Sequence, residues 1–336
     1  MAKRVTLAEV AAQAGVSPIT VSRALRRPDT VQPETRARID AAVAALGYVP
    51  DPAARALATG RSDVIGVLIP SATNAVFTDV LSGIYDRLAE SRFDVQYGIT
   101  RYDPGTEESL LGVFLRQRPA GLIVAGIDQT AAARRLLDRA GCPVVQVMEI
   151  GADPVDMMVG FSHHDAAAAA TRHLIAQGYR RPGFLGARMD PRTRRRFAGF
   201  RAEAEAAGIF DADRCETTET PSNVGMGAAL LRGLLERRPD TDAVFCNNDD
   251  LALGALFEAM RLGRAVPGDL GICGFNDLEM MRAAEPPITS VRTNRFEMGA
   301  RAAEMIRARL EGKDPGPALV DLGSEVQARR STEGPS

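Results

Sequence analysis

Two patterns of hydrophobic and polar positions divide the chain near residue 62. In the first 50 residues, apolar positions recur every three or four residues, which is the period of short amphipathic helices. Beyond residue 62, short continuous apolar runs alternate with longer stretches of helical period. The chain is therefore expected to form an all-α head followed by an α/β body.

The start of the head predicts a helix, a turn and the beginning of a second helix. Thr6 and Glu9 have the spacing of a capping box, which places the first helix at about 7–14. Gly15 breaks this helix where a tight turn is needed. Ser17 is a suitable N-cap for the second helix.

The second helix is expected at about 18–26, because Pro18 suits a first helical position. Val21 and Leu25 are expected to face the first helix. A third helix is expected at about 33–46. Two short helices joined by a glycine-containing turn are typical of helix-turn-helix DNA-binding domains, but they would also fit a small structural bundle.

In a helix-turn-helix domain, the second helix enters the major groove and its N-terminal residues reach the base edges. Arg23 could form two hydrogen bonds to guanine, and Ile19 could contact a thymine methyl group. Phosphate contacts orient such a domain without reading sequence. The residues expected to make them are Thr6, Ser17, Thr20 and Ser22.

Strands and helices are expected to alternate through the body. The predicted strands lie at 64–69, 93–99, 121–125, 143–148, 181–185, 242–246 and 269–275. The predicted helices lie at 76–92, 106–117, 129–140, 166–177, 194–207, 224–237 and 251–261. Such alternation implies parallel sheets covered by helices on both faces. The units are too many for one layer, so we expect two doubly wound lobes with a ligand site in the cleft between them.

The composition fits a protein of this organisation. The 336 residues are 45% hydrophobic and 25% charged, which is typical of a globular protein with a sizeable core. No stretch is apolar enough to span a membrane, and no cleavable signal follows the basic N-terminus, so a cytoplasmic protein is expected. Four cysteines without CxxC spacing indicate buried thiols rather than a disulfide framework or a metal site.

Charge is spread unevenly along the chain. Residues 1–60 contain eight lysines and arginines against five acidic residues, whereas the remainder contains 33 against 38. A basic head on an acidic body indicates that only the head meets a polyanion such as DNA.

The sequence offers little support for an enzyme. It lacks a dinucleotide-binding fingerprint after the first strand, a phosphate-binding P-loop and a GxSxG nucleophile elbow. His163 and His164 are adjacent, but the only other histidine is His173, so neither a metal nor a cofactor is expected. The histidine pair is expected to lie at a strand-to-helix junction.

Three short motifs give the head a family resemblance. They are Val5-Thr6-Leu7, Val21-Ser22-Arg23 and Leu46-Gly47-Tyr48-Val49-Pro50. With these motifs the head resembles the LacI/GalR family of bacterial repressors. The resemblance implies that Pro18, Ile19 and Arg23 contact bases. Proline cannot hydrogen-bond to a base, so Pro18 should contribute less to sequence recognition than the other two.

The segment 52–62 resembles the hinge helix of the same family. In the family, this helix folds when two subunits sit on operator DNA, and a leucine from each subunit enters the minor groove. Leu57 occupies that position here, and an apolar wedge of this kind kinks DNA. Leu57 could instead be an ordinary linker residue that packs on the body.

The resemblance extends over essentially the whole chain and implies a periplasmic-binding-protein-like body. The expected domains are a DNA-binding head at 1–50, a hinge and linker at 51–62, and an effector-binding and dimerisation domain at 63–336. Within that last domain, lobe one is expected at about 63–160 and 293–320. Lobe two is expected at about 161–292 and 321–330.

Several loops at strand ends are expected to line the cleft. Arg196 matches the arginine with which the family grips its effector, because a planar guanidinium can hold a carboxylate or vicinal hydroxyls. The neighbouring Arg192, Arg194 and Arg195 are expected to be surface charges. The other expected effector contacts are Ser71, Phe77, Glu149, Asn248 and Asn276. Asn248 could instead cap the helix at 251–261.

The expected effector is a small sugar or sugar acid. Many sugar-sensing relatives carry aspartate where this chain has Asn276, and a buried carboxylate would repel an anionic ligand. Asn276 and Arg196 together therefore permit a sugar acid. The segments 246–254, 274–281 and 290–293 resemble the gluconate-responsive repressors of the family. This resemblance implies gluconate first, and a related aldonate or phosphosugar next.

The resemblance implies a transcriptional repressor that binds double-stranded operator DNA as a homodimer and releases it when the effector binds. Residues 328–336 lack leucine heptads, so a dimer is expected rather than a tetramer. Two alternatives stay open. A sugar or sugar acid could act as a co-repressor that tightens DNA binding, or the chain could be a ligand-binding protein or enzyme that no longer binds DNA.

Overall fold

The described part of the head contains three α-helices around a small core. The computed structural model describes residues 5–26, 28–49 and 60–334, and its contacts divide the chain into two units between Ser62 and Asp63. The helices of the first unit are α1 (Leu7–Ala14), α2 (Pro18–Arg26) and α3 (Pro33–Leu46), with the short 3-10 helix η1 (Pro28–Thr30) before α3. Val10, Val21 and Ile39 form the centre of their core.

The beginnings of α1 and α2 follow the signals in the sequence. The Thr6 hydroxyl accepts a hydrogen bond from the Glu9 amide, and the Glu9 carboxylate accepts one from the Thr6 amide, which completes the capping box. Gly15 adopts a left-handed conformation, with φ of 64°, and ends α1. The Ser17 hydroxyl accepts from the Thr20 amide at the start of α2. These predictions are confirmed.

The expectation that Leu25 faces α1 is wrong. Leu25 is 36% exposed, whereas Ala24 is buried and packs in the core with Val21. Ala24 lies three residues after Val21 and therefore shares its helical face. Its small side chain lets α2 approach the neighbouring helices closely, and the larger leucine stays at the edge of that face.

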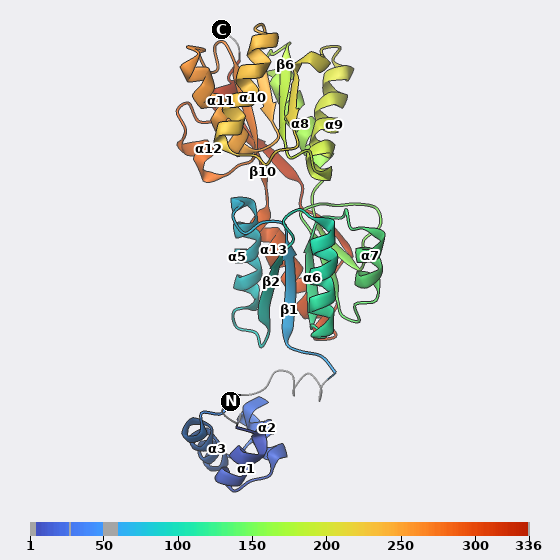
Figure 1. The fold of residues 1–336 in the computed structure, drawn as a ribbon, viewed down its shortest axis with the longest axis vertical. Helices are drawn as coiled ribbons and strands as arrows, with labels where there is room; N and C mark the ends of the chain where they lie inside the picture. The colour runs from blue at the N-terminus through green and yellow to red at the C-terminus, as the bar shows by residue number, and fades with distance from the viewer. Residues whose placement is uncertain (1–4, 27, 50–59, 335–336) are drawn as a thin grey trace. The chain divides into compact units, whose positions relative to one another are not determined.

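The first sheet of the body, with its helices, forms lobe one (Figure 1). Its strand order is β11-β5-β4-β3-β1-β2, and all neighbouring strands are parallel. The strands are β1 (Val64–Ile69), β2 (Asp94–Ile99), β3 (Gly121–Ala125), β4 (Val144–Val147), β5 (Met157–Gly160) and β11 (Leu319–Asp321). The helices are α5 (Ala75–Leu88), α6 (Pro104–Arg116), α7 (Ala131–Asp138) and α13 (Arg295–Leu310).

The second sheet and its helices form lobe two. Its strand order is β12-β10-β9-β8-β6-β7, and only β12 runs antiparallel to its neighbour. The strands are β6 (Pro182–Ala187), β7 (Cys215–Thr218), β8 (Ala243–Cys246), β9 (Gly271–Asn276), β10 (Thr289–Thr293) and β12 (Ser324–Gln327). The helices are α8 (His163–Ala176), α9 (Pro191–Ala206), α10 (Val224–Arg237), α11 (Asp249–Arg261) and α12 (Glu279–Ala283), with short 3-10 helices at η2 (Ala212–Arg214) and η3 (Arg330–Thr332). The predicted fold class, a helical head and two parallel-sheet lobes, is confirmed.

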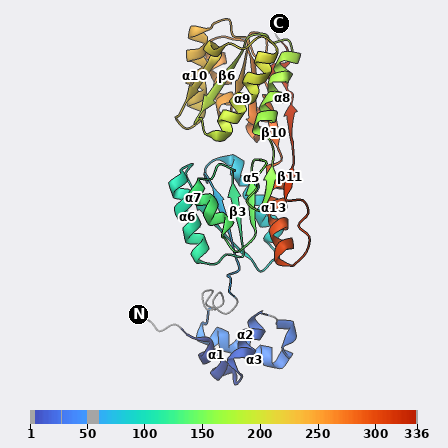
Figure 2. The ribbon, with the colours of Figure 1, turned by 90° about the vertical axis from the view of Figure 1, so that its right-hand side faces the viewer.

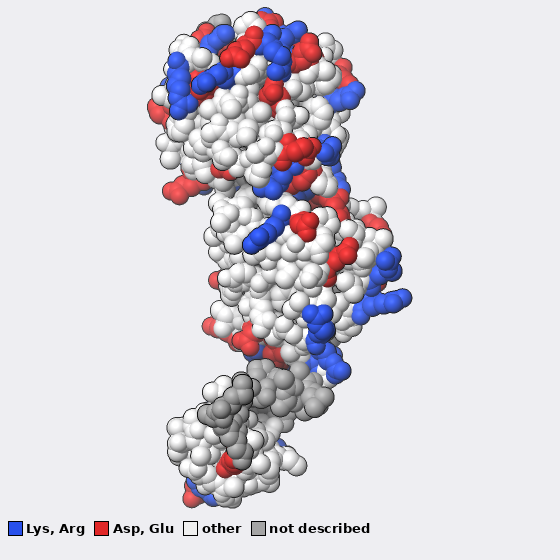
Figure 3. Space-filling view, in the orientation of Figure 1, with Lys and Arg blue, Asp and Glu red and all other residues white. Residues whose placement is uncertain are grey.

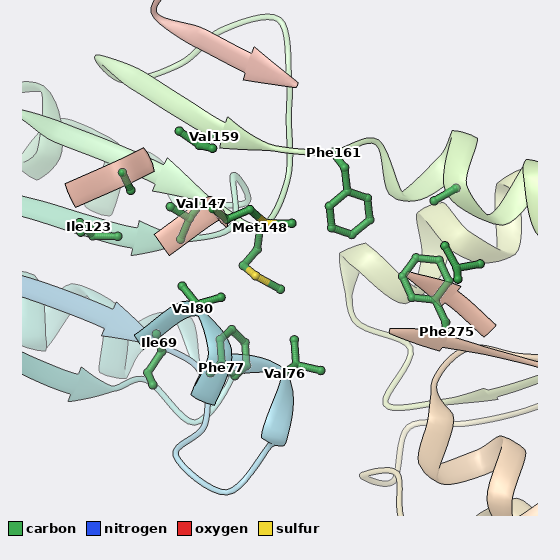
Figure 4. Close-up of a cluster of buried hydrophobic side chains, with 14 of the residues drawn as sticks. Ile69, Val76, Phe77, Val80, Ile123, Val147, Met148, Val159, Phe161 and Phe275 are labelled. Carbon is green, nitrogen blue, oxygen red and sulfur yellow. The ribbon is translucent and has the colours of Figure 1, made fainter. Parts of the chain in front are cut away.

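Within the described body, the chain passes between the lobes at three places (Figure 2). These crossings lie between β5 and α8, between β10 and α13, and between β11 and β12. Buried side chains of both lobes, including Met148, Phe161 and Phe275, join one hydrophobic cluster there (Figure 4). The two lobes are therefore separate sheets that share a packed contact next to the cleft.

Candidate functional site

A cavity of about 370 Å³ lies between the two lobes of the body. Its volume falls within the usual range for small-molecule sites. The predicted effector contacts that line it are Ser71, Phe77, Arg196, Asn248 and Asn276. Because these residues come from both lobes, a bound molecule can contact both lobes at once.

The lobe-one wall of the cavity is built by the segment before α5 and the segment after β2. The Ser71 hydroxyl accepts hydrogen bonds from the amides of Thr73 and Asn74, both at 3.2 Å, and so holds the loop before α5. Phe77 is 2% exposed and lies in the first turn of that helix. The Tyr102 hydroxyl accepts from the Asn74 side chain at 3.2 Å. This wall is therefore internally hydrogen-bonded and partly aromatic.

Arg196 reaches the cavity from α9 in lobe two and is only 8% exposed. Its Nε donates to Nδ1 of His163 at 3.1 Å, and its Nη1 donates to the carbonyl of Asn247. Its guanidinium carbon lies 3.8 Å from the centre of the Phe275 ring. Burial lowers the pKa of Arg196 to about 10, so the side chain stays charged at neutral pH. Arg196 is therefore a desolvated cation that is already oriented by its neighbours.

Asn248 and Asn276 follow β8 and β9 and line the cavity from lobe two. The Asn248 side-chain oxygen accepts from the Leu251 amide at 3.1 Å and caps α11. Capping α11 and contacting an effector are compatible roles for Asn248, since its amide nitrogen can still donate to a ligand. Asn276 has a φ of 113°, and its carbonyl accepts from Arg295, which also pairs with Asp79 of α5.

Glu149 does not line the cavity, contrary to expectation. It is 1% exposed and accepts a hydrogen bond from Nη1 of Arg195 at 2.9 Å. Arg195 also pairs with Asp128, so one arginine of lobe two binds two carboxylates of lobe one. Burial raises the pKa of Glu149 to about 7, although Arg195 acts in the opposite direction. Glu149 therefore belongs to a contact between the lobes.

The assignment of Arg192 to the surface is wrong, because this residue lines the cavity. Arg188, which directly follows β6, lines it too. The guanidinium carbon of Arg188 is 4.0 Å from the centre of the Tyr102 ring, and that of Arg192 is 6.0 Å from Phe77 and 5.9 Å from Tyr102. Among the residues that the structure describes, neither arginine has an ion-pair partner. Both are therefore cations that face aromatic rings across the cleft.

Cations outnumber carboxylates among the residues that line the cavity. Three arginines, Arg188, Arg192 and Arg196, face two carboxylates, those of Asp190 and Asp250. Asp190 is engaged as the N-cap of α9. Burial raises the pKa of Asp250 above its usual value. The electrostatics of the cavity therefore favour an anionic ligand.

The residues expected to face DNA lie on α2 and at the helix starts. Ser17, Pro18, Ile19 and Arg23 are exposed, Thr20 and Ser22 are half-buried, and Thr6 is exposed at the start of α1. Ile19 is 69% exposed, which is high for so apolar a side chain. An apolar group and an arginine on the first turns of an exposed helix can contact a thymine methyl group and guanine in a major groove.

Leu57 lies outside the described residues, as do the other residues from 50 to 59. Its insertion into the minor groove therefore stays a prediction. The same holds for the expected hinge helix.

The surface of the body differs from that of a polyanion-binding domain on the face drawn in Figure 3. Acidic and basic side chains are interspersed there over both lobes. Such a mixture does not create the single-sign field that attracts DNA. Among the described helices, none is long and apolar enough to cross a membrane.

Known proteins resemble this chain in both of its units. Residues 6–51 match the family described as bacterial regulatory proteins, lacI family, and residues 171–332 match the periplasmic binding protein-like domain. The chain is 42% identical over 329 residues to the HTH-type transcriptional regulator GntR of Pseudomonas aeruginosa. That alignment covers 98% of this chain and 96% of the relative.

Solved structures show the same likeness over the whole chain. A LacI-family transcriptional regulator from Silicibacter pomeroyi is 38% identical with a TM-score of 0.90, and the match covers 98% of this chain and 99% of that one. The lac repressor dimer bound to operator and the anti-inducer ONPF is 25% identical with a TM-score of 0.84, again over 98% and 99% of the two chains. Head and body are thus matched together.

Proposed function

Because the chain belongs to the lacI family of bacterial regulatory proteins, we propose that it is a repressor released from operator DNA by gluconate or a closely related sugar acid. The chain is a DNA-binding transcriptional regulator with an effector-binding domain. Its relatives are transcriptional regulators and not enzymes. The effector, the direction of its effect and the dimeric form are the parts that we propose.

The excess of arginine in the cavity is the observation that favours a sugar acid as the effector. Arg188 and Arg192 have no ion-pair partner in the described part of the chain, and Arg196 is held at the wall by His163 and Asn247. A carboxylate accepts two parallel hydrogen bonds from one guanidinium, which a neutral sugar matches less well. An amide at position 276 adds no negative charge that would oppose such a ligand.

The rest of the cavity suits a polyhydroxylated chain. Ser71, Asn248 and Asn276 carry groups that can exchange hydrogen bonds with hydroxyls. The rings of Phe77 and Tyr102 offer apolar faces to C–H groups. These features, together with the resemblance of three segments to gluconate-responsive repressors, favour gluconate over other sugar acids.

Two heads of a homodimer would bind one operator, because the half-sites of helix-turn-helix proteins are usually related by two-fold symmetry. In this proposal Ile19 and Arg23 of α2 read bases and Leu57 acts as the wedge. A lac repressor relative has been solved as a dimer on its operator, which supports the dimeric form. An effector that binds one arrangement of the lobes better than another would then shift the dimer away from DNA.

The test is binding of the full chain to pseudo-palindromic fragments from upstream of its own and neighbouring genes, at one salt concentration. Binding is measured without ligand, with gluconate and with sorbitol, which has a similar hydroxyl pattern but no carboxylate. We expect release by gluconate and no release by sorbitol. Release by both would contradict the role of the arginines, and tighter binding with gluconate would mean co-repression. Binding without sequence preference in all fragments would contradict the repressor function itself.

A further inference from the structure

The side chain of His163 links the two lobes inside the protein. His163 is the first residue of α8, directly after the crossing from β5, and it has no exposed surface. Its Nδ1 accepts the hydrogen bond from Nε of Arg196 in lobe two, at 3.1 Å. Its Nε2 lies 3.1 Å from the carbonyl oxygen of Met148 in lobe one. One imidazole therefore touches the candidate effector arginine on one side and the opposite lobe on the other.

The two partners of His163 decide its tautomer. The Nε group of arginine can only donate, so Nδ1 of His163 carries no hydrogen. A carbonyl oxygen can only accept, so Nε2 carries the hydrogen and donates it to Met148. The ring is thus neutral. Burial, and then the charges of Arg196, Arg192 and Arg195 on α9, keep the pKa of His163 well below its usual value.

Aromatic neighbours hold the imidazole in this orientation. The Phe161 ring meets it edge-to-face at 4.4 Å between centres, and the Phe275 ring stacks on it at 6.0 Å. Figure 4 shows Phe161 between Met148 of lobe one and Phe275 of lobe two. Phe275 also lies against the guanidinium of Arg196. The imidazole is therefore packed between rings, while His163, Met148 and Arg196 all line the cavity.

The backbone around the link leaves little room for adjustment. Met148 has a φ of 79°, which is uncommon for a residue other than glycine, and its amide donates to the carbonyl of Val159 at 3.2 Å. On the other side, α9 crosses α8 at Gly199, where any Cβ atom would collide with the carbonyl of His164. The two ends of the link thus belong to different lobes, so a relative movement that separates His163 from Met148 breaks it.

We propose that His163 is the positioning residue that couples the effector site to the lobe arrangement. It holds Arg196 through Nδ1 and, through Nε2, connects that arginine to Met148 of lobe one. An effector that draws Arg196 toward itself changes this link, and with it the stability of one lobe arrangement over the other. The inference rests on the proposed function, because it assumes a sugar acid at Arg196.

The other hydrogen-bonded contacts between the lobes are less suited to this role. Arg195 pairs with Asp128 and Glu149, but it is one-third exposed and does not line the cavity. Arg295 joins Asp79 to the carbonyl of Asn276 without contacting Arg196. Among these contacts, only the His163 link includes the arginine expected to bind the effector.

Two substitutions separate the two halves of the link. His163→Asn keeps an oxygen near the position of Nδ1, which can accept from Arg196, but it cannot reach Met148. His163→Gln keeps an amide near the position of Nε2, which can donate to Met148, but it leaves Nε of Arg196 without its acceptor. His164→Asn is the matched control, because His164 is exposed, pairs with its neighbour Asp165 and is not among the residues that line the cavity.

The measurements are gluconate affinity by calorimetry and operator affinity with and without gluconate, on the full chain. His163→Asn is expected to reduce the effect of gluconate on operator affinity about tenfold, and gluconate affinity by less. His163→Gln is expected to weaken gluconate binding about tenfold. The proposal is overturned if His163→Asn keeps the wild-type response, or if both variants only lower both affinities in parallel. If His163→Asn does not fold, the proposal is judged on His163→Gln, and unchanged gluconate affinity in that variant overturns it.

A ligand-free measurement separates this inference from the choice of gluconate. The ¹⁵N shifts of the His163 ring should show hydrogen on Nε2 only and no titration between about pH 5 and 8. The opposite tautomer, or titration near the usual pKa, would overturn the link even if another effector is found. If wild type ignores gluconate while His163 shows the expected tautomer, the proposed effector fails and the link stands.

Discussion

The two binding surfaces of this protein are assembled in different ways. The residues expected to meet DNA are mostly neighbours in sequence, on and just before α2. The cavity gathers residues from both sheets, from Ser71 in lobe one to Met280 in lobe two. A surface on one helix depends on capping and helical period alone, whereas a cavity requires that both lobes be folded and in contact.

The two surfaces also hold their arginines differently. Arg23 is exposed on α2, whereas Arg196 is buried and hydrogen-bonded to other residues of the body. An exposed side chain exchanges water for a base or phosphate, so the net gain is modest. A buried guanidinium has already lost its water, and its attraction to an anion is less screened. Substitution of Arg196 is therefore expected to have a larger effect than substitution of Arg23.

The largest effect is expected for Arg196→Gln. Gluconate binding should fall by more than about 100-fold, because a desolvated charge-assisted contact is lost. Operator affinity without gluconate should change much less, because Arg196 is not among the residues expected to contact DNA and acts on the lobe arrangement only through His163. Calorimetry with gluconate and fluorescence anisotropy with operator DNA measure the two quantities. A variant that still releases its operator with gluconate would remove Arg196 from the effector site.

Arg23→Ala should have the next largest effect, now on the other surface. Operator affinity should fall about 10- to 100-fold, and discrimination against substituted operators should relax, because a paired contact to guanine is lost. Gluconate affinity should not change. Anisotropy with operator variants at one salt concentration measures both aspects. Equal loss for all DNA sequences would assign Arg23 to phosphate rather than to a base.

Arg192→Gln should weaken gluconate binding by on the order of tenfold, because it removes one of the two cavity arginines that have no ion-pair partner in the described part of the chain. Binding of sorbitol, measured in the same calorimeter, should be little affected because it has no carboxylate. Arg201→Gln is the matched control, since Arg201 lies on the same helix but is exposed and paired with Glu205. Equal loss for gluconate and sorbitol would contradict recognition of the carboxylate by Arg192.

The smallest effect is expected for Glu149→Gln, which tests the contact between the lobes. Burial raises the pKa of Glu149 to about 7, so the stability contributed by its neutral form is full below about pH 4.5 and is lost as pH rises through about 7. The variant should therefore lose less stability than wild type between pH 5 and 8, by on the order of 1 kcal/mol. Urea unfolding at both pH values measures this difference.

The Glu149 result is interpreted with a second buried carboxyl and a control variant in mind. Asp249 is also buried, with its pKa raised to about 7, so part of the pH dependence should remain in the variant. Glu219→Gln serves as the control, because Glu219 pairs with Arg194 on the surface and is largely exposed. A pH dependence identical in wild type and Glu149→Gln would show that this carboxyl does not titrate as its burial implies.

For the head, the sequence alone was almost sufficient. The capping box of Thr6 and Glu9, the turn at Gly15 and the cap at Ser17 all act between residues within three or four positions of each other. Among the described residues of the head, Leu25 was misplaced, because helical period cannot tell which of two adjacent apolar positions points more directly at a partner helix.

In the body, the sequence predicted several of the buried strands and the residues that follow them, but it missed β5, which is wholly buried as well. The apolar runs at β1 and β3 were predicted with their observed bounds, and Arg196 and Asn276 were placed at a cleft by strand order and resemblance. Helix α13 was missed, because its buried face consists largely of small residues such as Gly299 and Ala302, which leave a weak hydrophobic signal.

Only the tertiary structure decided which charged side chains face the cavity, which join the lobes and which face water. Arg192, Arg194 and Arg195 are almost contiguous and look alike in sequence, yet the first lines the cavity, the second is mainly exposed and the third binds lobe one. His163 likewise gained its two partners from residues in different elements. Hydrophobic period and capping act within one element, whereas the environment of a charge depends on whichever distant segments pack around it.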